Sequence, residues 1–285
     1  MSIFLQPTSP YSFDLSMRRL AAMPRMVLFQ LAEGPSLVRA FPTGLVRVSQ
    51  AGDALRVEIE GELDPAAVLP MIRHAFSLDL DHQAFLAHMA EADPAMAAQV
   101  ERYRGARPIV PFTRWESLAW AVIGQQISLS AAFSLQAGVL RLAGGEWGGV
   151  PYFPDSVAVA TLSYEQLRGV GFSQRKAEYL IDLARLVASG ELDLAAVAAL
   201  PLETAIERLA ALRGIGRWTA ERFLMDSGHL DAFPAADVGV RNGLIQLYGW
   251  TEKPTEEQIR AVGERWRPYR ALSTYYLWLG LLLSK

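Results

Sequence analysis

The residues best suited to chemistry lie between Leu212 and Arg241, where a glycine-rich turn, a helix-forming run and an isolated acid follow one another. Gly214 and Gly216 allow a tight hairpin whose backbone can approach an anion closely. The unpaired N–H groups at the start of the next helix would then point at a phosphate. Further on, Asp237 precedes another helix, where an ionised carboxylate could stabilise positive charge developing in a reaction. The stretch therefore predicts a phosphate-binding turn followed by a catalytic acid.

Both features also have purely structural explanations, which the sequence leaves open. A Gly-Ile-Gly segment before a helix can be an ordinary tight turn, and Asp237 can simply cap the helix that starts at Val238. A dinucleotide-binding loop is not expected, because Thr219 occupies the sixth position of that motif and a helix leads into it. The sequence also contains no GK[ST] phosphate loop.

The composition excludes several classes of site. The chain of 285 residues has no cysteine, and its four histidines are scattered. Disulfides, thiolate metal sites, cysteine nucleophiles and cysteine-held clusters are therefore excluded, and no metal site is expected. The hydrophobic content of 51% is enough for a sizeable core.

The charge balance gives two opposing indications about a nucleic-acid partner. A net charge of −3 by itself argues against one. Only three of the 27 basic residues are lysines, however, and arginine suits bidentate phosphate contacts. A compositional bias of the genome would explain the arginines equally well. A turn that binds phosphate through backbone amides needs no basic surface.

Neither end of the chain resembles a membrane or export segment. The start, MSIFLQPTSPYSF, lacks a basic region followed by an apolar run, so no signal peptide is expected. The apolar LWLGLLLS near the C-terminus is far shorter than the roughly 20 residues that span a bilayer. The sequence therefore predicts a soluble, intracellular, cytoplasmic protein with no membrane partner.

Residues 1 to about 80 form a region that differs from the rest of the chain. Met26–Leu31 and Ser36–Phe41 are apolar runs around one turn, and Val46–Val48 and Leu55–Ile59 alternate apolar and polar residues around another. They predict two hairpins in an antiparallel sheet with one solvent-exposed face. Asp64 is then expected to cap a helix that begins with proline.

After Asp81 nearly all of the chain has helical spacing and helix-capping residues. Gly144–Gly149 is expected to be a loop. A near-repeat, Leu167–Gly171 and Leu212–Gly216, recurs with a spacing of 45 residues and predicts two helix–hairpin–helix units. The other expected helices are Asp81–Glu91, Pro94–Tyr103, a helix capped by Thr113, a helix from Ser128 to Ala143, Pro201–Ala211, Val238–Tyr248, Thr255–Trp266 and Arg270–Leu283.

In combination, these motifs resemble one known family. LRGIGRWTA, followed after about fifteen residues by DAFPAADVGVR, resembles the helix–hairpin–helix DNA glycosylase superfamily, in particular its 3-methyladenine DNA glycosylase II branch. The resemblance also covers IGQQIS at Ile123–Ser128, GVGFSQRKAEYL at Gly169–Leu180 and Trp266–Arg270. It extends from about Phe112 to the end, and more loosely over the N-terminal hairpins.

The resemblance implies an α+β chain that is mainly helical, with the helix–hairpin–helix glycosylase fold. Residues 112–229 would form a six-helix unit with the hairpin. Residues 81–111 and 230–285 would form a second helical unit that carries the catalytic Asp, with DNA in the cleft between the two. A small antiparallel α+β domain, residues 1–80, would precede them.

The resemblance also assigns roles to individual residues. Asp237 would be catalytic, while Asp231 in the same loop would only structure it. Gln126, with Gln125 beside it, would enter the gap that a flipped nucleotide leaves in the duplex. A loop-capping role remains an alternative for Gln126. The DNA backbone would be bound by Gly214, Gly216, Arg217 and Thr219.

Trp218 determines the expected reaction type. Relatives that also cut the DNA backbone carry a lysine nucleophile at this position, so its absence predicts a monofunctional glycosylase. The indole could instead stack on a cationic alkylated base, at about 0.5–2 kcal/mol, although core packing is the alternative. Tyr269, Arg222 and Val238 would complete a base pocket that is wider and less aromatic than is familiar in this branch.

The expected function is release of alkylated purines, of the 3-methyladenine and 7-methylguanine type, from double-stranded DNA to leave an abasic site. The alternatives are a glycosylase for oxidised or mismatched bases and a non-catalytic module that recognises DNA structure. Trp218 and the absence of cysteine argue against the lyase and cluster-bearing forms of the first. A monomer without a cofactor is expected, with the main-chain carbonyls of the hairpin as a candidate site for a monovalent cation.

Overall fold

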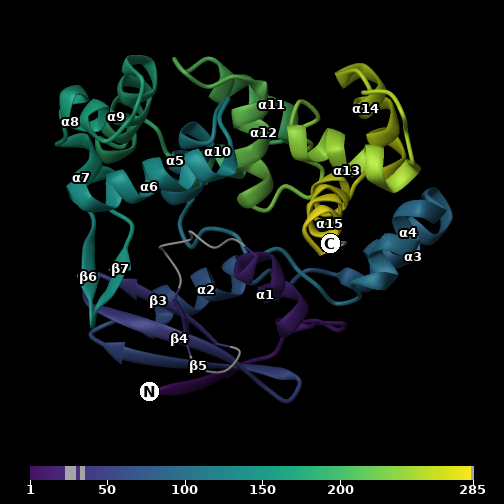
Figure 1. Ribbon diagram of the computed structural model, residues 1–285. Helices are drawn as coiled ribbons and strands as arrows, with labels where there is room; N and C mark the ends of the chain where they lie inside the picture. Colours follow the sequence, from purple (N-terminus) through teal and green to yellow (C-terminus); the bar gives the residue numbers. More distant parts are fainter. Residues whose placement is uncertain (23–29, 33–35, 284–285) are drawn as a thin grey trace.

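The computed structural model describes residues 1–22, 30–32 and 36–283, and it places a small sheet beside a larger array of helices (Figure 1). The expected fold class, mainly helical with a small antiparallel sheet near the N-terminus, is confirmed. Residues 26–29 of the first predicted strand and 33–35 of its turn lie outside the described residues. No helix among the described residues is both long and apolar enough to cross a bilayer.

The sheet contains five antiparallel strands in the order β1-β5-β4-β3-β2. The second predicted hairpin is present as β4 and β5, with Val48 opposite Val57. Where the first was predicted, β2 pairs with β3, with Leu31 opposite Leu37, and the pairing of β3 with β4 was not predicted. The first strand, β1, was not predicted. The strands are β1 (Ser2–Leu5), β2 (Gln30–Ala32), β3 (Ser36–Phe41), β4 (Gly44–Ala51) and β5 (Ala54–Gly61).

Helices α1 (Phe13–Ala21) and α2 (Pro65–Ala75) share one apolar core with the sheet. Asp64 caps α2 as predicted, by accepting a hydrogen bond from the N–H of Ala66. Helix α1 was not predicted. It also packs against α15, and this contact joins the sheet region to the C-terminal helices (Figure 1).

The other face of the sheet is less exposed than predicted. Residues 144–149 do not form a plain loop, because β6 (Gly145–Trp147) and β7 (Val150–Tyr152) pair as a hairpin. Gly148 and Gly149 form its turn with φ angles of 56° and 76°, the left-handed pair that a tight hairpin requires. Val150 packs on Val38 and Leu45, so the hairpin covers part of the sheet (Figure 1).

Thr113 and Ser128 cap their helices as predicted, each by accepting a hydrogen bond from a backbone N–H in the first turn. Asp81 and Thr255, which were predicted as the first residues of helices, are caps of the same kind. The helices are α3 (His82–Ala92), α4 (Pro94–Arg102), α5 (Arg114–Ile123), α6 (Leu129–Ala143), α7 (Ser156–Ala160), α8 (Tyr164–Gly169), α9 (Gln174–Ala188), α10 (Leu194–Ala198), α11 (Leu202–Ala210), α12 (Arg217–Asp226), α13 (Val238–Tyr248), α14 (Glu256–Gly263), the 3₁₀ helix η1 (Glu264–Trp266) and α15 (Arg270–Leu283).

The C-terminal helices pack on α3 and α4, which are distant from them in sequence (Figure 1). Asp93, at the junction of α3 and α4, accepts hydrogen bonds from the Trp266 indole, at 2.8 Å, and from the Tyr248 hydroxyl. The hydroxyl of Tyr276 lies 2.6 Å from His82 Nε2. The buried apolar residues of this group and of α5–α12 form one continuous core.

The two hairpins of the near-repeat differ in conformation. In the first, α8 continues through Gly169, and Gly171 adopts the positive φ of 104°. In the second, α11 ends earlier and Gly214 adopts a φ of 90°. A side chain on Gly214 would meet the ring of Tyr179 in α9 at 2.2 Å, so this glycine also lets the two units pack together.

Candidate active site

Asp237 is the N-cap of α13, and its carboxylate is held by backbone and side-chain donors. Oδ1 accepts hydrogen bonds from the N–H groups of Gly239 at 2.7 Å and Val240 at 3.1 Å. This geometry matches the capping alternative, and the positive end of the helix dipole favours the ionised carboxylate. The capping hydrogen bonds use only Oδ1, so Oδ2 can make a different contact. Capping and a chemical role are therefore compatible.

Two indoles from different helices converge on this carboxylate. Trp218 of α12 donates its Nε1–H to Oδ2 at 3.3 Å, and Trp278 of α15 donates its Nε1–H to Oδ1 at 3.3 Å. A side chain at Gly239 would lie 2.7 Å from the Trp278 nitrogen and 2.8 Å from Asp237 Oδ1, so only glycine fits beneath the indole. The carboxylate is half-buried, and both its oxygens have fixed orientations.

Trp218 joins three of the predicted site features. Its indole is half-buried, and its six-membered ring lies next to Gly124, where an added Cβ would be 3.9 Å from Cη2. Gly124 ends α5 immediately before Gln125 and Gln126. The core-packing alternative therefore accounts for only part of the Trp218 contacts, because its N–H is directed at Asp237.

Trp278 is a site residue that the sequence analysis did not identify. The pattern of α15 makes Trp278 one more apolar residue in a long apolar helix. It lies 41 residues from Asp237 in the chain, and no local motif links the two. Only the packing of α15 against α13 brings them together.

The three other residues predicted to line the base pocket lie in different surroundings. Arg222 lies with its guanidinium carbon 5.1 Å from the Trp278 ring centre and pairs with the buried carboxylate of Asp226. Val238 is 57% exposed beside Asp237. The ring of Tyr269 packs on Phe85 and His88 of α3. These contacts do not place it beside Trp218 or Trp278.

The hairpin leaves the start of α12 open. Gly216 is the N-cap of α12 and makes no side-chain capping bond, whereas Ser173 caps the corresponding helix α9 by accepting from the N–H of Lys176. Gly216 is exposed, and an added Cβ there would meet nothing within 4 Å. The first N–H groups of α12 are therefore without a side-chain acceptor at a position that is open to an external anion.

Two predictions about side chains near the hairpin need correction. Thr219 is 2% exposed, so its hydroxyl cannot reach an external phosphate. Gln125 does not project outward, because its amide donates to the Gly214 carbonyl at 2.8 Å and to the Thr219 hydroxyl at 2.9 Å. Arg217 pairs with Glu203 and Glu221 at 3.0 and 2.8 Å, but its side chain is 48% exposed, so its contact with the DNA backbone stays a prediction.

Gln126 is exposed and has an unusual backbone conformation, and its role as a DNA wedge stays a prediction. It is one of two non-glycine residues with positive φ in the part of the chain that the structure describes, with a value of 54°. Such a conformation is strained for most side chains and often occurs at functional sites. Ile127 and Leu129, next to it, expose 37% and 47% of their surfaces.

Asp231 and Lys176 have structural contacts. Asp231 is held by Arg270 Nε and Arg267 Nη1, each at 2.7 Å, in agreement with its expected loop-structuring role. Lys176 Nζ donates to the carbonyl of Ile123 at the end of α5, at 2.9 Å, and burial lowers the pKa of this amine.

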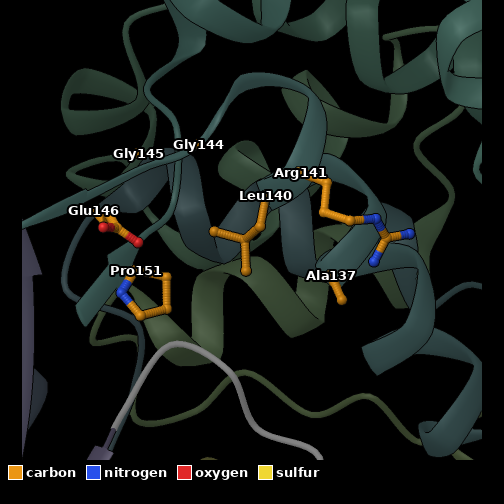
Figure 2. Close-up of a pocket in the computed structure, with 7 residues that line it drawn as sticks. All are labelled: Ala137, Leu140, Arg141, Gly144, Gly145, Glu146 and Pro151. Carbon is orange, nitrogen blue, oxygen red and sulfur yellow. The ribbon is translucent and has the colours of Figure 1, made fainter. Parts of the chain in front are cut away.

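The predicted cation site and the surface hollows add no further chemistry to this region. The carbonyls of Leu212 and Gly214 already accept hydrogen bonds from Ile215 N and Gln125 Nε2, and a cation at the hairpin stays a prediction. Within the described residues, no group of three or more His, Cys, Asp or Glu side chains is placed to hold a metal ion. Figure 2 shows a hollow beside α6 and the β6–β7 hairpin, lined by Leu140, Arg141 and Glu146 and by none of the residues above.

Residues 119–268 match the family described as HhH-GPD superfamily base excision DNA repair protein. A DNA-3-methyladenine glycosylase of Bacillus subtilis strain 168 is 35% identical over 216 residues, which cover 74% of this chain and 71% of that protein.

Two solved structures are also similar. The 3-methyladenine DNA glycosylase from Archaeoglobus fulgidus has a TM-score of 0.82 and 27% identity over 98% of this chain and 97% of that one. The Schizosaccharomyces pombe 3-methyladenine DNA glycosylase in complex with abasic DNA has a TM-score of 0.61 and 28% identity over 68% of this chain and 95% of that one. Since the family match alone covers more than half of the sequence, the chain belongs to the HhH-GPD superfamily of base excision DNA repair proteins.

Proposed function

We propose that this protein is a monofunctional DNA glycosylase that acts as a monomer, turns an alkylated purine out of duplex DNA and hydrolyses its bond to the sugar. The observation that carries the proposal is the Asp237 carboxylate, fixed by the α13 amides and two indoles next to the open start of α12. The names of the relatives, DNA-3-methyladenine glycosylases, support the substrate class.

The chemistry follows from the charge that develops at the sugar. As the C1′–N bond breaks, positive charge spreads over the sugar ring in an oxocarbenium-like state, as in glycoside hydrolysis. The Asp237 carboxylate stabilises this charge and directs a water molecule to C1′. Its orientation is set before the substrate arrives, because helix α13 and the indoles already hold it. Trp218 gives a cationic alkylated base an aromatic surface.

Binding and flipping use the remaining features. The free N–H groups at Gly216 and the first turn of α12 bind a phosphate of the DNA backbone. Gln126 enters the duplex at the vacated position and offsets part of the unstacking cost of a few kcal/mol. Its neighbours Ile127 and Leu129 add apolar surface against the bases.

The product is an intact abasic site. Trp218 stands where a lysine nucleophile would be needed for strand cleavage, and the Lys176 amine is engaged at the end of α5. Strand scission is therefore expected only after alkali or heat. A covalent enzyme–DNA adduct trapped by borohydride would overturn this part of the proposal.

The deciding experiment is base release from a duplex that carries a single 7-methylguanine, measured under single-turnover conditions. Release of the free base together with an alkali-sensitive site is the expected result. Tight binding to the duplex without base release would favour a non-catalytic module. Release only from duplexes with oxidised or mismatched bases would show that the proposed substrate class is wrong, while the proposed hydrolysis would still hold.

A further inference from the structure

Arg19 is a cation from the N-terminal helix α1 that reaches the candidate active site. Its guanidinium carbon lies 5.0 Å from the centre of the Trp278 ring and 5.9 Å from that of Tyr275, both in α15. The Arg19 side chain is half-buried, and its Nε atom has no hydrogen-bond partner among the described residues. The adjacent Arg18 points to the surface and pairs with Asp14.

Two carboxylates, Asp226 and Asp237, act on Arg19 electrostatically, but neither forms an ion pair with it among the described residues. The second guanidinium at this indole belongs to Arg222, which already pairs with the buried Asp226. Asp237 also acts on Arg19 electrostatically, but it is directed at the sugar and held by its own donors. Burial lowers the pKa of the Arg19 guanidinium and Arg222 lowers it further, yet an arginine stays protonated in a folded protein.

A buried guanidinium N–H without an acceptor is costly, and one at an active site indicates a ligand with hydrogen-bond acceptors. Resting on the function proposed above, we infer that Arg19 is the residue that extends the activity to neutral damaged purines with carbonyl or ring-nitrogen acceptors. Trp278 lies between Arg19 and Asp237, because its indole N–H donates to the Asp237 carboxylate and its ring packs against the Arg19 guanidinium. Arg19 donates to the acceptors of the flipped base.

The need for this cation depends on the charge of the base. When C1′–N9 of a neutral purine breaks, the electron pair moves to the base, which leaves as an anion. Water adds its oxygen to C1′, and the proton that it loses ends on the departed base. A positive guanidinium beside the base stabilises that negative charge in the transition state. A cationic N7-alkylated purine leaves as a neutral base, and the water proton goes to solvent, so Arg19 gives no such help.

The test compares two duplexes that each carry one lesion, hypoxanthine as a neutral base and 7-methylguanine as a cationic base. Arg19→Met keeps an unbranched apolar chain against Trp278 and Tyr275 and removes only the charged head. Hypoxanthine release is expected to fall about 10²-fold in single-turnover assays. The release of 7-methylguanine is expected to stay near the wild-type rate, or to rise because a like charge is gone.

Two further variants separate chemistry from folding. Arg19→Lys keeps the charge and is expected to restore a substantial part of hypoxanthine release, whereas Arg18→Met, on the exposed side of the same helix, should change neither rate. Equal losses on both duplexes in Arg19→Met would show that Arg19 only joins α1 to α15, and this would overturn the inference. Wild-type protein that releases 7-methylguanine but not hypoxanthine would overturn it while the proposed function stands. Release of neither base would refute the proposed function itself.

Discussion

Replacing Asp237 with asparagine separates helix capping, which the structure shows, from the catalytic role proposed for this residue. The asparagine carbonyl oxygen can take the place of Oδ1 and keep both bonds, from the N–H groups of Gly239 and Val240. Its NH₂ group then replaces Oδ2 and faces the Trp218 N–H, so the 3.3 Å hydrogen bond is lost with the charge. The variant therefore retains the cap and removes the negative charge beside the sugar.

The two roles predict effects of different size. Asparagine caps a helix about as well as aspartate, and the lost interaction with the helix dipole is about 0.3–1 kcal/mol. With the weakened Trp218 contact, the free energy of unfolding should fall by less than about 2 kcal/mol. Removing one fixed electrostatic group from an active site costs about 2.7–4 kcal/mol in activation free energy, or about 10²–10³ in rate.

The assay measures single-turnover release of 7-methylguanine, with denaturant unfolding and binding to an abasic-site analogue measured in parallel. Asp193 is the matched control, because its Oδ1 caps α10 in the same way, by accepting from Ala195 N at 2.8 Å and Ala196 N at 3.0 Å. Asp193→Asn should cost similar stability and leave base release unchanged. Affinity of Asp237→Asn for the abasic analogue should hold or rise, because a negative charge near the backbone is gone.

A near-normal release rate in Asp237→Asn would refute the reasoning. Capping would then be the complete account of Asp237, and the convergence of two indoles on it would have to be explained by packing. A large loss of stability together with a proportional loss of release would also count against a chemical role.

Three other predictions follow from the hairpin, the exposed glutamine and the lysines. Gly216→Ala should leave stability unchanged, since its Cβ meets nothing within 4 Å, and should weaken duplex binding several-fold in an equilibrium titration. Gly214→Ala should instead destabilise the fold because of the positive φ and the tyrosine ring at 2.2 Å. Gln126→Ala should slow release from paired DNA and spare single-stranded DNA, whereas Gln125→Ala should lower both rates. Borohydride should trap no adduct with wild-type protein, and Lys176→Arg should leave the yield of abasic sites unchanged.

The elements that the sequence predicts well are those whose ends are defined locally. A Ser, Thr or Asp accepts a hydrogen bond from a backbone N–H two or three residues later, so Thr113, Ser128 and Asp64 mark their helices without information about tertiary structure. Helix α13 begins and ends as predicted because Asp237 caps its start and Gly249, with a φ of 66°, ends it. The β4–β5 hairpin follows from period-two alternation in the same way.

Short elements were missed because their stability comes from packing. Strand β1 pairs with β5 across more than 50 residues of sequence, with Ser2 opposite Glu58. Helix α1 forms against the sheet and α15. The β6–β7 hairpin has only three residues in each strand and is held by its contact with Val38 and Leu45. Patterns within a window of ten residues do not contain these contacts.

The same limit explains the errors in the candidate site. Sequence spacing placed Gln125 and Thr219 near the hairpin correctly, but it could not give the direction of their side chains. Both are turned toward the protein, because Gln125 donates to the Gly214 carbonyl and to the Thr219 hydroxyl. Trp278 and Arg19 were missed because residues become part of a site through tertiary packing.

These contacts also show how the parts of the site keep a fixed geometry relative to one another. Gln125 joins the end of α5 to the hairpin carbonyl, and Trp218 connects Gly124 with the Asp237 carboxylate. The exposed Gln126 is the next residue after Gln125. In the proposed function, a flipped base vacates a position next to Gln126 while its sugar reaches the carboxylate that Trp218 contacts, and both residues belong to one packed unit. We therefore expect the inward-turned side chains to fix the distance between the point of insertion and the point of bond cleavage.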